Sequence, residues 1–131
     1  MKKVFFLLLV VLLSNWATAQ ITDYSIFDKK FNFYVANDLG RNGYYDQKPI
    51  AELMGTMAEE VGPEFVVATG DIHHFEGVRS VNDPLWMTNY ELIYSHPELM
   101  IDWFPVLGNH EYRGNTQAVM DYTCLLYTSP S

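Results

Sequence analysis

The stretch FVVATGDIHHFEG, residues 65–77, contains the features that decide the fold. Its first five residues, 65–69, form an uninterrupted β-prone run, which is typical of a strand covered by helices on both faces. Gly70 and Asp71 follow the run directly, and a polar loop comes after them. This order predicts a buried strand that places polar side chains at its carboxyl end.

A strand and a helix are expected before this run. Residues 31–36, FNFYVA, should form the first strand, and the polar, glycine-containing loop 37–47 follows it. Pro49 suits the first turn of a helix, and Gly62 with Pro63 should end that helix. The expected core face of the helix is an apolar stripe at helical spacing, made of Ile50, Leu53, Met54, Met57 and Val61.

A second helix and a third strand are expected after it. Asp83 and Pro84 offer an N-cap and a first-turn residue. The apolar residues that keep helical spacing after them are Trp86, Tyr90 and Ile93. Pro105 cannot donate a hydrogen bond to a sheet, so residues 105–107 should form a short strand with the proline at its start or edge. The βαβαβ order predicts an α/β protein with parallel strands and right-handed crossovers.

Polar residues follow each of the three predicted strands. Asp38, Asp71 and Asn109 come after the first, second and third strand. Because the carboxyl ends of parallel strands meet at one edge of a sheet, these side chains should converge. Each residue alone has an ordinary explanation as a turn or helix cap. Together they are typical of a site for two metal ions about 3.5–4 Å apart that hydrolyses phosphate esters.

Three motifs in this order resemble those of the calcineurin-like metallophosphoesterases. They read Asp38-Leu39-Gly40, Gly70-Asp71-Ile72-His73-His74 and Gly108-Asn109-His110-Glu111. Within that superfamily, residues 31–115 are most similar to the small, tartrate-resistant type of purple acid phosphatase. The resemblance implies that the chain forms the N-terminal βαβαβ part of a four-layer α/β/β/α sandwich.

The resemblance implies a role for each ligand position. Asp38 would be a terminal ligand of the first metal, Asp71 would bridge both metals, and Asn109 would bind the second. His74 stands where the purple enzymes have a tyrosine, so an imidazole replaces a phenolate, and a preference for trivalent iron is no longer implied. His74 is predicted to be a ligand and His73 a spectator, because adjacent side chains of an extended stretch point in opposite directions.

The resemblance also implies the chemistry. His110 would lie beside the substrate phosphate and assist the leaving group, and Glu111 would orient that histidine. The cofactors would be two metal ions, iron paired with zinc, manganese or iron, whose bound water or hydroxide attacks a small phosphate monoester. A phosphodiesterase on the same scaffold and a catalytically silent binding domain remain as alternatives.

Aromatic residues lie on or beside the predicted site loops. Tyr44, Tyr45 and Tyr112 could stack on an aromatic or nucleoside leaving group, or they could pack the loops against the scaffold, and the sequence leaves both interpretations open. His96, directly before Pro97, is expected to be a surface residue or a helix-end cation.

Composition excludes two classes of protein. The 131 residues include 16 acidic and 8 basic side chains, a formal net charge of −8, so a basic face for nucleic acid is not expected. Aromatic residues make up 15% of the chain, and such a content argues against intrinsic disorder.

The chain is expected to divide into three parts. Residues 1–19 resemble a signal peptide, with two lysines before ten apolar residues and small residues at the end. Ten apolar residues are few for a transmembrane anchor, which is the alternative, so we expect cleavage near Ala19, export to the periplasm or medium, and no stable membrane insertion. Residues 20–123 should be the N-terminal part of the metallophosphoesterase domain. Residues 124–131, CLLYTSPS, resemble a translated sequencing-library adapter, with an ordinary C-terminal tail as the alternative.

The histidine count bears on activity. The resembled family completes its two metal sites with three further histidines from the second half of its fold. The histidines of this chain are His73, His74, His96 and His110. We therefore expect the parent protein to be an exported dimetal phosphatase, and this piece alone to bind metal weakly and to hydrolyse little.

Overall fold

The computed structural model describes residues 23–28 and 30–128, with side chains described up to residue 122. The expected signal peptide, residues 1–19, and the last three residues of the expected adapter-derived tail lie outside the described part. The backbone of residues 124–128 continues a helix that starts at Thr116. Among the described residues, no helix is both long enough and apolar enough to cross a membrane.

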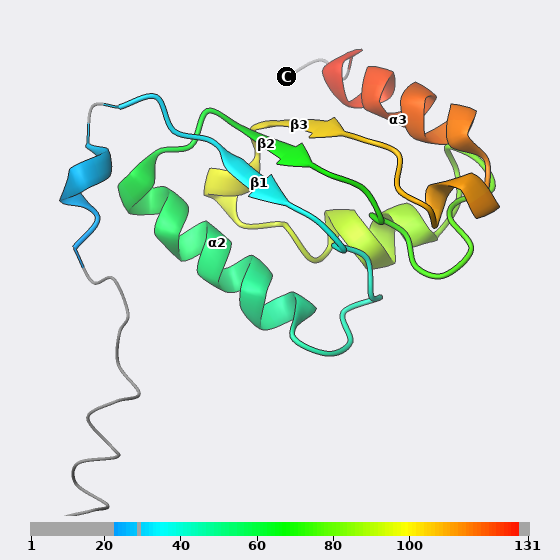
Figure 1. The fold of residues 1–131 in the computed structure, drawn as a ribbon, viewed down its shortest axis with the longest axis horizontal. Coiled ribbons are helices and arrows are strands. Elements are labelled where there is room, and N and C mark those ends of the chain that lie inside the picture. Colours follow the sequence, from blue (N-terminus) through cyan, green and yellow to red (C-terminus); the bar gives the residue numbers. More distant parts are fainter. Residues whose placement is uncertain (1–22, 29, 129–131) are drawn as a thin grey trace, which may run out of the picture.

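The fold is built on a three-stranded parallel sheet with β2 in the centre (Figure 1). The strands are β1 (Tyr34–Ala36), β2 (Phe65–Ala68) and β3 (Asp102–Pro105). Val67 of β2 is paired with Val35 of β1 and with Phe104 of β3. The α/β class and the parallel order predicted from the sequence are confirmed.

The third strand lies earlier in the chain than predicted. Residues 105–107 were expected, but β3 ends at Pro105. β3 is an edge strand that pairs with β2 alone. A proline at its end therefore does not interrupt hydrogen bonding to a second neighbouring strand. The N–H of Val106 then donates to the carbonyl of Ala68 at 2.8 Å.

The helix α2 (Gln47–Val61) forms the first crossover and covers one face of the sheet (Figure 1). Gly62 ends it in a left-handed conformation with φ 59°, as the sequence predicts. The predicted core stripe is wrong at two positions, because Ile50 and Leu53 are half exposed. The buried residues of the helix are Gln47, Ala51, Gly55 and Ala58. Small side chains let the helix backbone approach its neighbours closely. The helix therefore packs through these small residues and not through its larger apolar ones.

The second crossover contains short helices instead of the single longer helix predicted. They are the π-helix η2 (Met87–Glu91) and the 3-10 helix η3 (Pro97–Leu99). Asp83 accepts hydrogen bonds from the N–H groups of Arg79 and Leu85 at 2.8 and 3.0 Å, which agrees with its predicted capping position.

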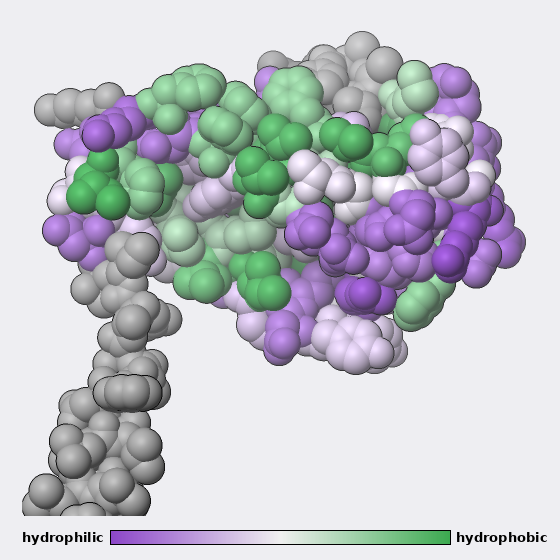
Figure 2. Space-filling model, in the orientation of Figure 1, coloured by the Kyte–Doolittle hydropathy of each residue, from purple (hydrophilic) through white to green (hydrophobic). Residues whose placement is uncertain are grey.

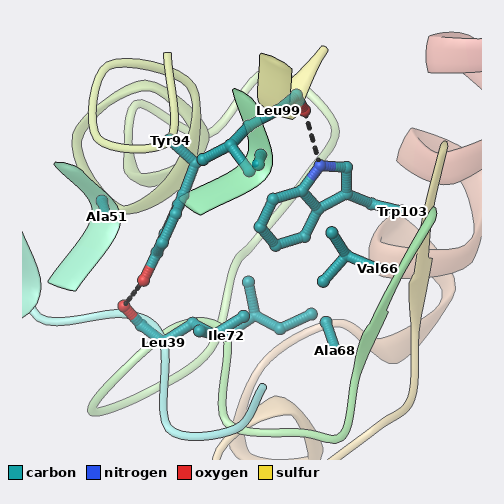
Figure 3. Packing of buried hydrophobic residues seen from close by; sticks show 9 residues of the cluster. Leu39, Ala51, Val66, Ala68, Ile72, Tyr94, Leu99 and Trp103 are labelled. Carbon is teal, nitrogen blue, oxygen red and sulfur yellow. Dashed lines mark hydrogen bonds between the residues drawn. The ribbon is translucent and has the colours of Figure 1, made fainter. Parts of the chain in front are cut away.

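The main core lies between α2, the second crossover and the sheet (Figure 3). Tyr94 and Trp103 carry polar atoms into this core, and both atoms are satisfied. The Tyr94 hydroxyl donates to the carbonyl of Leu39 at 3.1 Å, and the indole N–H of Trp103 donates to the carbonyl of Leu99 at 3.0 Å. The bond from Tyr94 fixes the loop after β1, next to Asp38.

The other face of the sheet remains open among the described residues. The sequence predicted helices on both faces of β2, but Val35 is 64% exposed and Phe104 is 46% exposed on this second face. The rings of Phe33 and Phe65 stack there with centroids 5.0 Å apart. Helix α3 (Thr116–Thr128) packs beside β3 (Figure 1).

Candidate metal centre

The loops after the three strands meet at the carboxyl edge of the sheet, where Figure 2 shows hydrophilic residues gathered (right side). The N–H of Asp38 donates to the carbonyl of Gly70 at 3.2 Å, and the N–H of Gly40 donates to the carbonyl of Asp71 at 3.4 Å. These bonds join the first loop to the second. Asp38 and Asp71 both have φ 54°, a left-handed conformation that costs energy for a residue with a side chain and is often found at functional sites.

Two glycines join the second loop to the third. Gly70 has φ 103°, a backbone conformation that favours glycine. Gly108 matters for a different reason, because a Cβ atom there would lie 2.4 Å from the backbone nitrogen of Asp71. Glycine before Asn109 therefore permits close packing of the two loops.

Three side chains bring metal-ligating atoms together at this edge. Asp71, His74 and His110 each offer one donor atom, and these atoms lie within 4.8 Å of one another. The N–H of His110 donates to Oδ1 of Asp71 at 2.9 Å and thereby holds the carboxylate in place. One carboxylate and two imidazoles are a donor set that suits iron, zinc or manganese, so these residues fit the implied metal ions.

Backbone contacts fix the ring of His74. Its Nδ1 lies 2.9 Å from the carbonyl oxygen of Gly40, which can only accept, so Nδ1 carries the proton. The other nitrogen, Nε2, lies 3.5 Å from Oδ1 of Asp38 and is free to bind a metal. Burial lowers the pKa of His74, and the charges of Arg41 and His110 lower it further. The neutral imidazole required of a ligand is therefore favoured.

The ring of His110 is held by a partner that the sequence did not indicate. Its Nδ1 lies 2.6 Å from the carbonyl oxygen of Phe75, so Nδ1 donates and Nε2 keeps its lone pair. Arg113 donates to the same carbonyl at 3.3 Å. The ring centroids of His110 and His74 are 4.1 Å apart. The implied role for Glu111, orienting His110, has no hydrogen bond to support it among the described residues.

Glu111 instead links the second loop to the third through hydrogen bonds to their backbones. Its carboxylate is fully buried and accepts hydrogen bonds from the N–H groups of Asp71 and Gly108 at 2.8 Å and of His73 at 3.0 Å. Three charge-assisted bonds offset the cost of burying the carboxylate. Glu111 thus fixes the backbone on both sides of the donor group.

The remaining predicted residues lie outside the donor group. His73 is fully buried with its ring against Trp86, the centroids 4.3 Å apart, and burial lowers its pKa to about 4. Asp38 lies at the border of the group through its contact with His74. Asn109 is exposed on the third loop, and its side chain has no hydrogen bond to any residue that the structure describes.

Sequence reasoning missed Arg41, Gly40 and Phe75. Gly40 and Phe75 act through backbone carbonyls, which every residue has, so no side-chain pattern could reveal them. Arg41 follows the first motif directly, and its charge beside a metal-ligand motif was a signal available in the sequence.

The fold and this site define a calcineurin-like phosphoesterase. The family model described as calcineurin-like phosphoesterase matches residues 31–129. The chain therefore belongs to the calcineurin-like phosphoesterase family, as its three motifs predicted.

Curated relatives of this chain are acid phosphatases. Purple acid phosphatase 7 of Arabidopsis thaliana is 41% identical over 91 residues, which cover 70% of this chain and 28% of the relative. Purple acid phosphatase 3 of the same plant is 37% identical over 114 residues, 85% of this chain and 31% of the relative. Tartrate-resistant acid phosphatase type 5 of Oryctolagus cuniculus is 31% identical over 74 residues, 56% of this chain and 23% of the relative. The chain spans less than a third of the length of these relatives.

Proposed function

We propose that the protein is an exported, metal-dependent phosphatase that hydrolyses small phosphate monoesters. The observation that carries this proposal is the donor group at the carboxyl edge of the sheet, where Asp71, His74 and His110 bring their donor atoms within 4.8 Å. Membership of the calcineurin-like phosphoesterase family and the similarity to acid phosphatases support the same reaction class.

The proposed ligands of the dimetal centre are Asp71 and His74 of the donor group together with Asp38 and Asn109, while His110 is proposed to face the substrate instead. Asp71 is proposed for the bridging position, because its carbonyl accepts from Gly40 of the first loop and its carboxylate accepts from His110 of the third. When bound, the metal ions lower the pKa of a water molecule and neutralise charge on the phosphoryl oxygens. The metal pair is proposed to be iron with zinc, manganese or a second iron. With His74 in the position of the tyrosine, the centre has no phenolate there.

His110 is proposed to act at the substrate. Because its Nδ1 donates to the carbonyl of Phe75, its Nε2 is the nitrogen that can hold or deliver a proton at the leaving-group oxygen. Glu111 is proposed as a positioning residue that acts through the backbone of both loops.

The proposal is tested in the full-length protein that carries this sequence. Asp71→Asn keeps an oxygen that accepts from the N–H of His110 but removes the charge, so we expect hydrolysis of 4-nitrophenyl phosphate to fall by more than about 100-fold and bound metal to decrease. The control is Glu98→Gln on exposed η3, which should match the wild type. Full activity of Asp71→Asn with retained metal would contradict the proposal.

The same protein distinguishes the alternatives. Faster turnover of bis(4-nitrophenyl) phosphate than of 4-nitrophenyl phosphate would identify a phosphodiesterase. Turnover of neither ester by metal-loaded, folded protein would favour a binding domain.

A further inference from the structure

A hollow of about 520 Å³ opens beside the donor group, and the proposed dimetal site does not account for it. It is lined by Arg41, Asn42, Tyr44, Tyr45, His74 and Phe75. His74 belongs both to the donor group and to the wall of the hollow. The hollow is therefore a space beside the proposed metals that the leaving group of a bound substrate could enter.

Aromatic side chains form much of the wall and are largely exposed. Phe75 is 62% exposed, Tyr44 is 71% exposed and Tyr45 is 82% exposed. These fractions contradict the interpretation that Tyr44 and Tyr45 pack their loop against the scaffold. Exposure of apolar rings to water is unfavourable, and a flat apolar group that stacks on them removes that area from water.

Arg41 adds a positive charge to the same wall. Its Cζ atom lies 5.6 Å from the centroid of the Phe75 ring, a cation–π arrangement. No carboxylate among the described residues lies within ion-pair distance of its guanidinium. A phosphate ester bound beside Arg41 would supply an anion that pairs with this charge.

We propose that this hollow is the leaving-group subsite, and that it selects phosphate monoesters with a flat aromatic leaving group. The proposal rests on the proposed phosphatase function. The ring of the leaving group stacks on Phe75 and the two tyrosines, while Arg41 borders both the ring and the phosphate. Arg41, Tyr44 and Phe75 are thus specificity-determining residues, and they contribute through binding of the leaving group.

The test compares two substrates that differ only in the flatness of the ring. Benzyl phosphate and cyclohexylmethyl phosphate both release a primary alcohol, so their intrinsic reactivity is similar. In the full-length wild-type protein we expect kcat/KM to be about tenfold higher for benzyl phosphate, a preference of the size that stacking and cation–π contacts provide. The ratio should fall toward one in Phe75→Leu and in Arg41→Gln, mainly through a higher KM for benzyl phosphate.

Tyr112→Leu is the matched control. Tyr112 is 70% exposed and lies on the third loop, outside the wall of the hollow, so its substitution should leave the ratio unchanged. If Phe75→Leu fails to fold, as judged by circular dichroism, Tyr44→Leu replaces it, because that side chain makes little contact with the fold.

The outcomes separate this proposal from the phosphatase assignment. Hydrolysis of both esters with equal kcat/KM, or a tenfold preference that survives in Phe75→Leu and Arg41→Gln, would overturn the subsite and leave the phosphatase standing. Hydrolysis of neither ester by metal-loaded protein would overturn the proposed function itself.

Discussion

At the residue scale, a buried carboxylate that is not a metal ligand organises the site. Glu111 accepts three backbone hydrogen bonds, from Asp71, His73 and Gly108, which belong to two different loops. Removing such an acceptor leaves buried N–H groups without a partner, and each unpaired group is costly. The geometry of the donor group therefore depends on a side chain that is not one of its members.

Glu111→Gln tests this dependence. The amide keeps the size of the side chain but replaces one accepting oxygen with an N–H₂ group that faces donors. We expect the free energy of unfolding to fall by about 2–3 kcal/mol in denaturant titrations. Glu98→Gln, in an exposed position on η3, serves as the control and should change it by less than about 0.5 kcal/mol. Equal stability of Glu111→Gln and Glu98→Gln would show that the Glu111 carboxylate does not hold the two loops together.

Tyr94 gives the fold a dependence on alkaline pH. Burial raises its pKa to about 12 from an ordinary 10.0, because the phenolate is poorly solvated beside the carbonyl of Leu39. Tyr94 ionises at a lower pH in the unfolded chain than in the folded protein. Its contribution to the free energy of unfolding is therefore fully present below pH 10 and is lost as the pH rises toward 12. The loss amounts to roughly 3 kcal/mol, about half of it by pH 11.

Tyr94→Phe isolates this effect from the other titrating groups. At pH 9 the variant lacks one hydrogen bond and should be less stable than the wild type by about 1 kcal/mol. As the pH rises from 10 to 12, the difference should shrink and then reverse in sign. Unfolding free energies measured between pH 9 and pH 11.5 would show it, and a difference that stays constant over that range would contradict the assignment.

At the element scale, α2 shows where a sequence pattern misleads. Ile50 and Leu53 fit an apolar stripe, yet the helix buries its small residues and leaves these two half exposed. A Cβ atom on Gly55 would lie 2.3 Å from the ring of His96 and 2.5 Å from its Cβ atom. The helix therefore packs through its backbone against the segment before η3.

We expect Gly55→Ala to destabilise the protein, which is the opposite of what helix propensity alone predicts. Alanine favours an exposed helix interior by about 1 kcal/mol relative to glycine, but here the methyl group overlaps His96. We expect a net loss of about 1–3 kcal/mol in the free energy of unfolding. Ile50→Ala, on the predicted core stripe, should cost less than that. A stabilised Gly55→Ala would show that the two segments do not pack closely.

The sequence predicted the elements that follow local rules. The run 65–69 and the stop at Gly62 depend on nearby residues, and both are confirmed within one residue. The end of β3 at Pro105 and the π-helix η2 depend on the edge position of the strand and on packing across the crossover, which local patterns do not encode. Likewise, the resemblance implied Asp71 and His74 as ligands, and their donor atoms do lie together, but the backbone carbonyl of Phe75 that orients His110 carries no sequence signal.

At the scale of the whole molecule, the two faces of the sheet are unequal. One face is covered by α2 and the second crossover, while the other presents an aromatic cluster to solvent. The members of this cluster are Phe31, Phe33, Phe65 and Phe104, whose rings lie 5.0 to 6.0 Å apart along the contacts that connect them. Exposed apolar patches of this kind are covered by another surface in stable proteins.

The open face predicts how residues 20–123 behave when they are prepared alone. Phe31 is 65% exposed, and Phe33 and Phe104 are each 46% exposed, so we expect the polypeptide to self-associate at micromolar concentration and to bind an apolar dye such as ANS. Phe33→Lys with Phe104→Lys should shift sedimentation toward the monomer and weaken dye binding severalfold. The control replaces Tyr44 and Tyr45 with lysine, two aromatic residues that are even more exposed and lie away from this face, and it should leave association unchanged. In the four-layer sandwich that the resemblance implies, a second half would cover this face, so we expect the same phenylalanine substitutions to prevent folding of a protein as long as the relatives. A fully stable double variant of that protein would show that the face stays in contact with water.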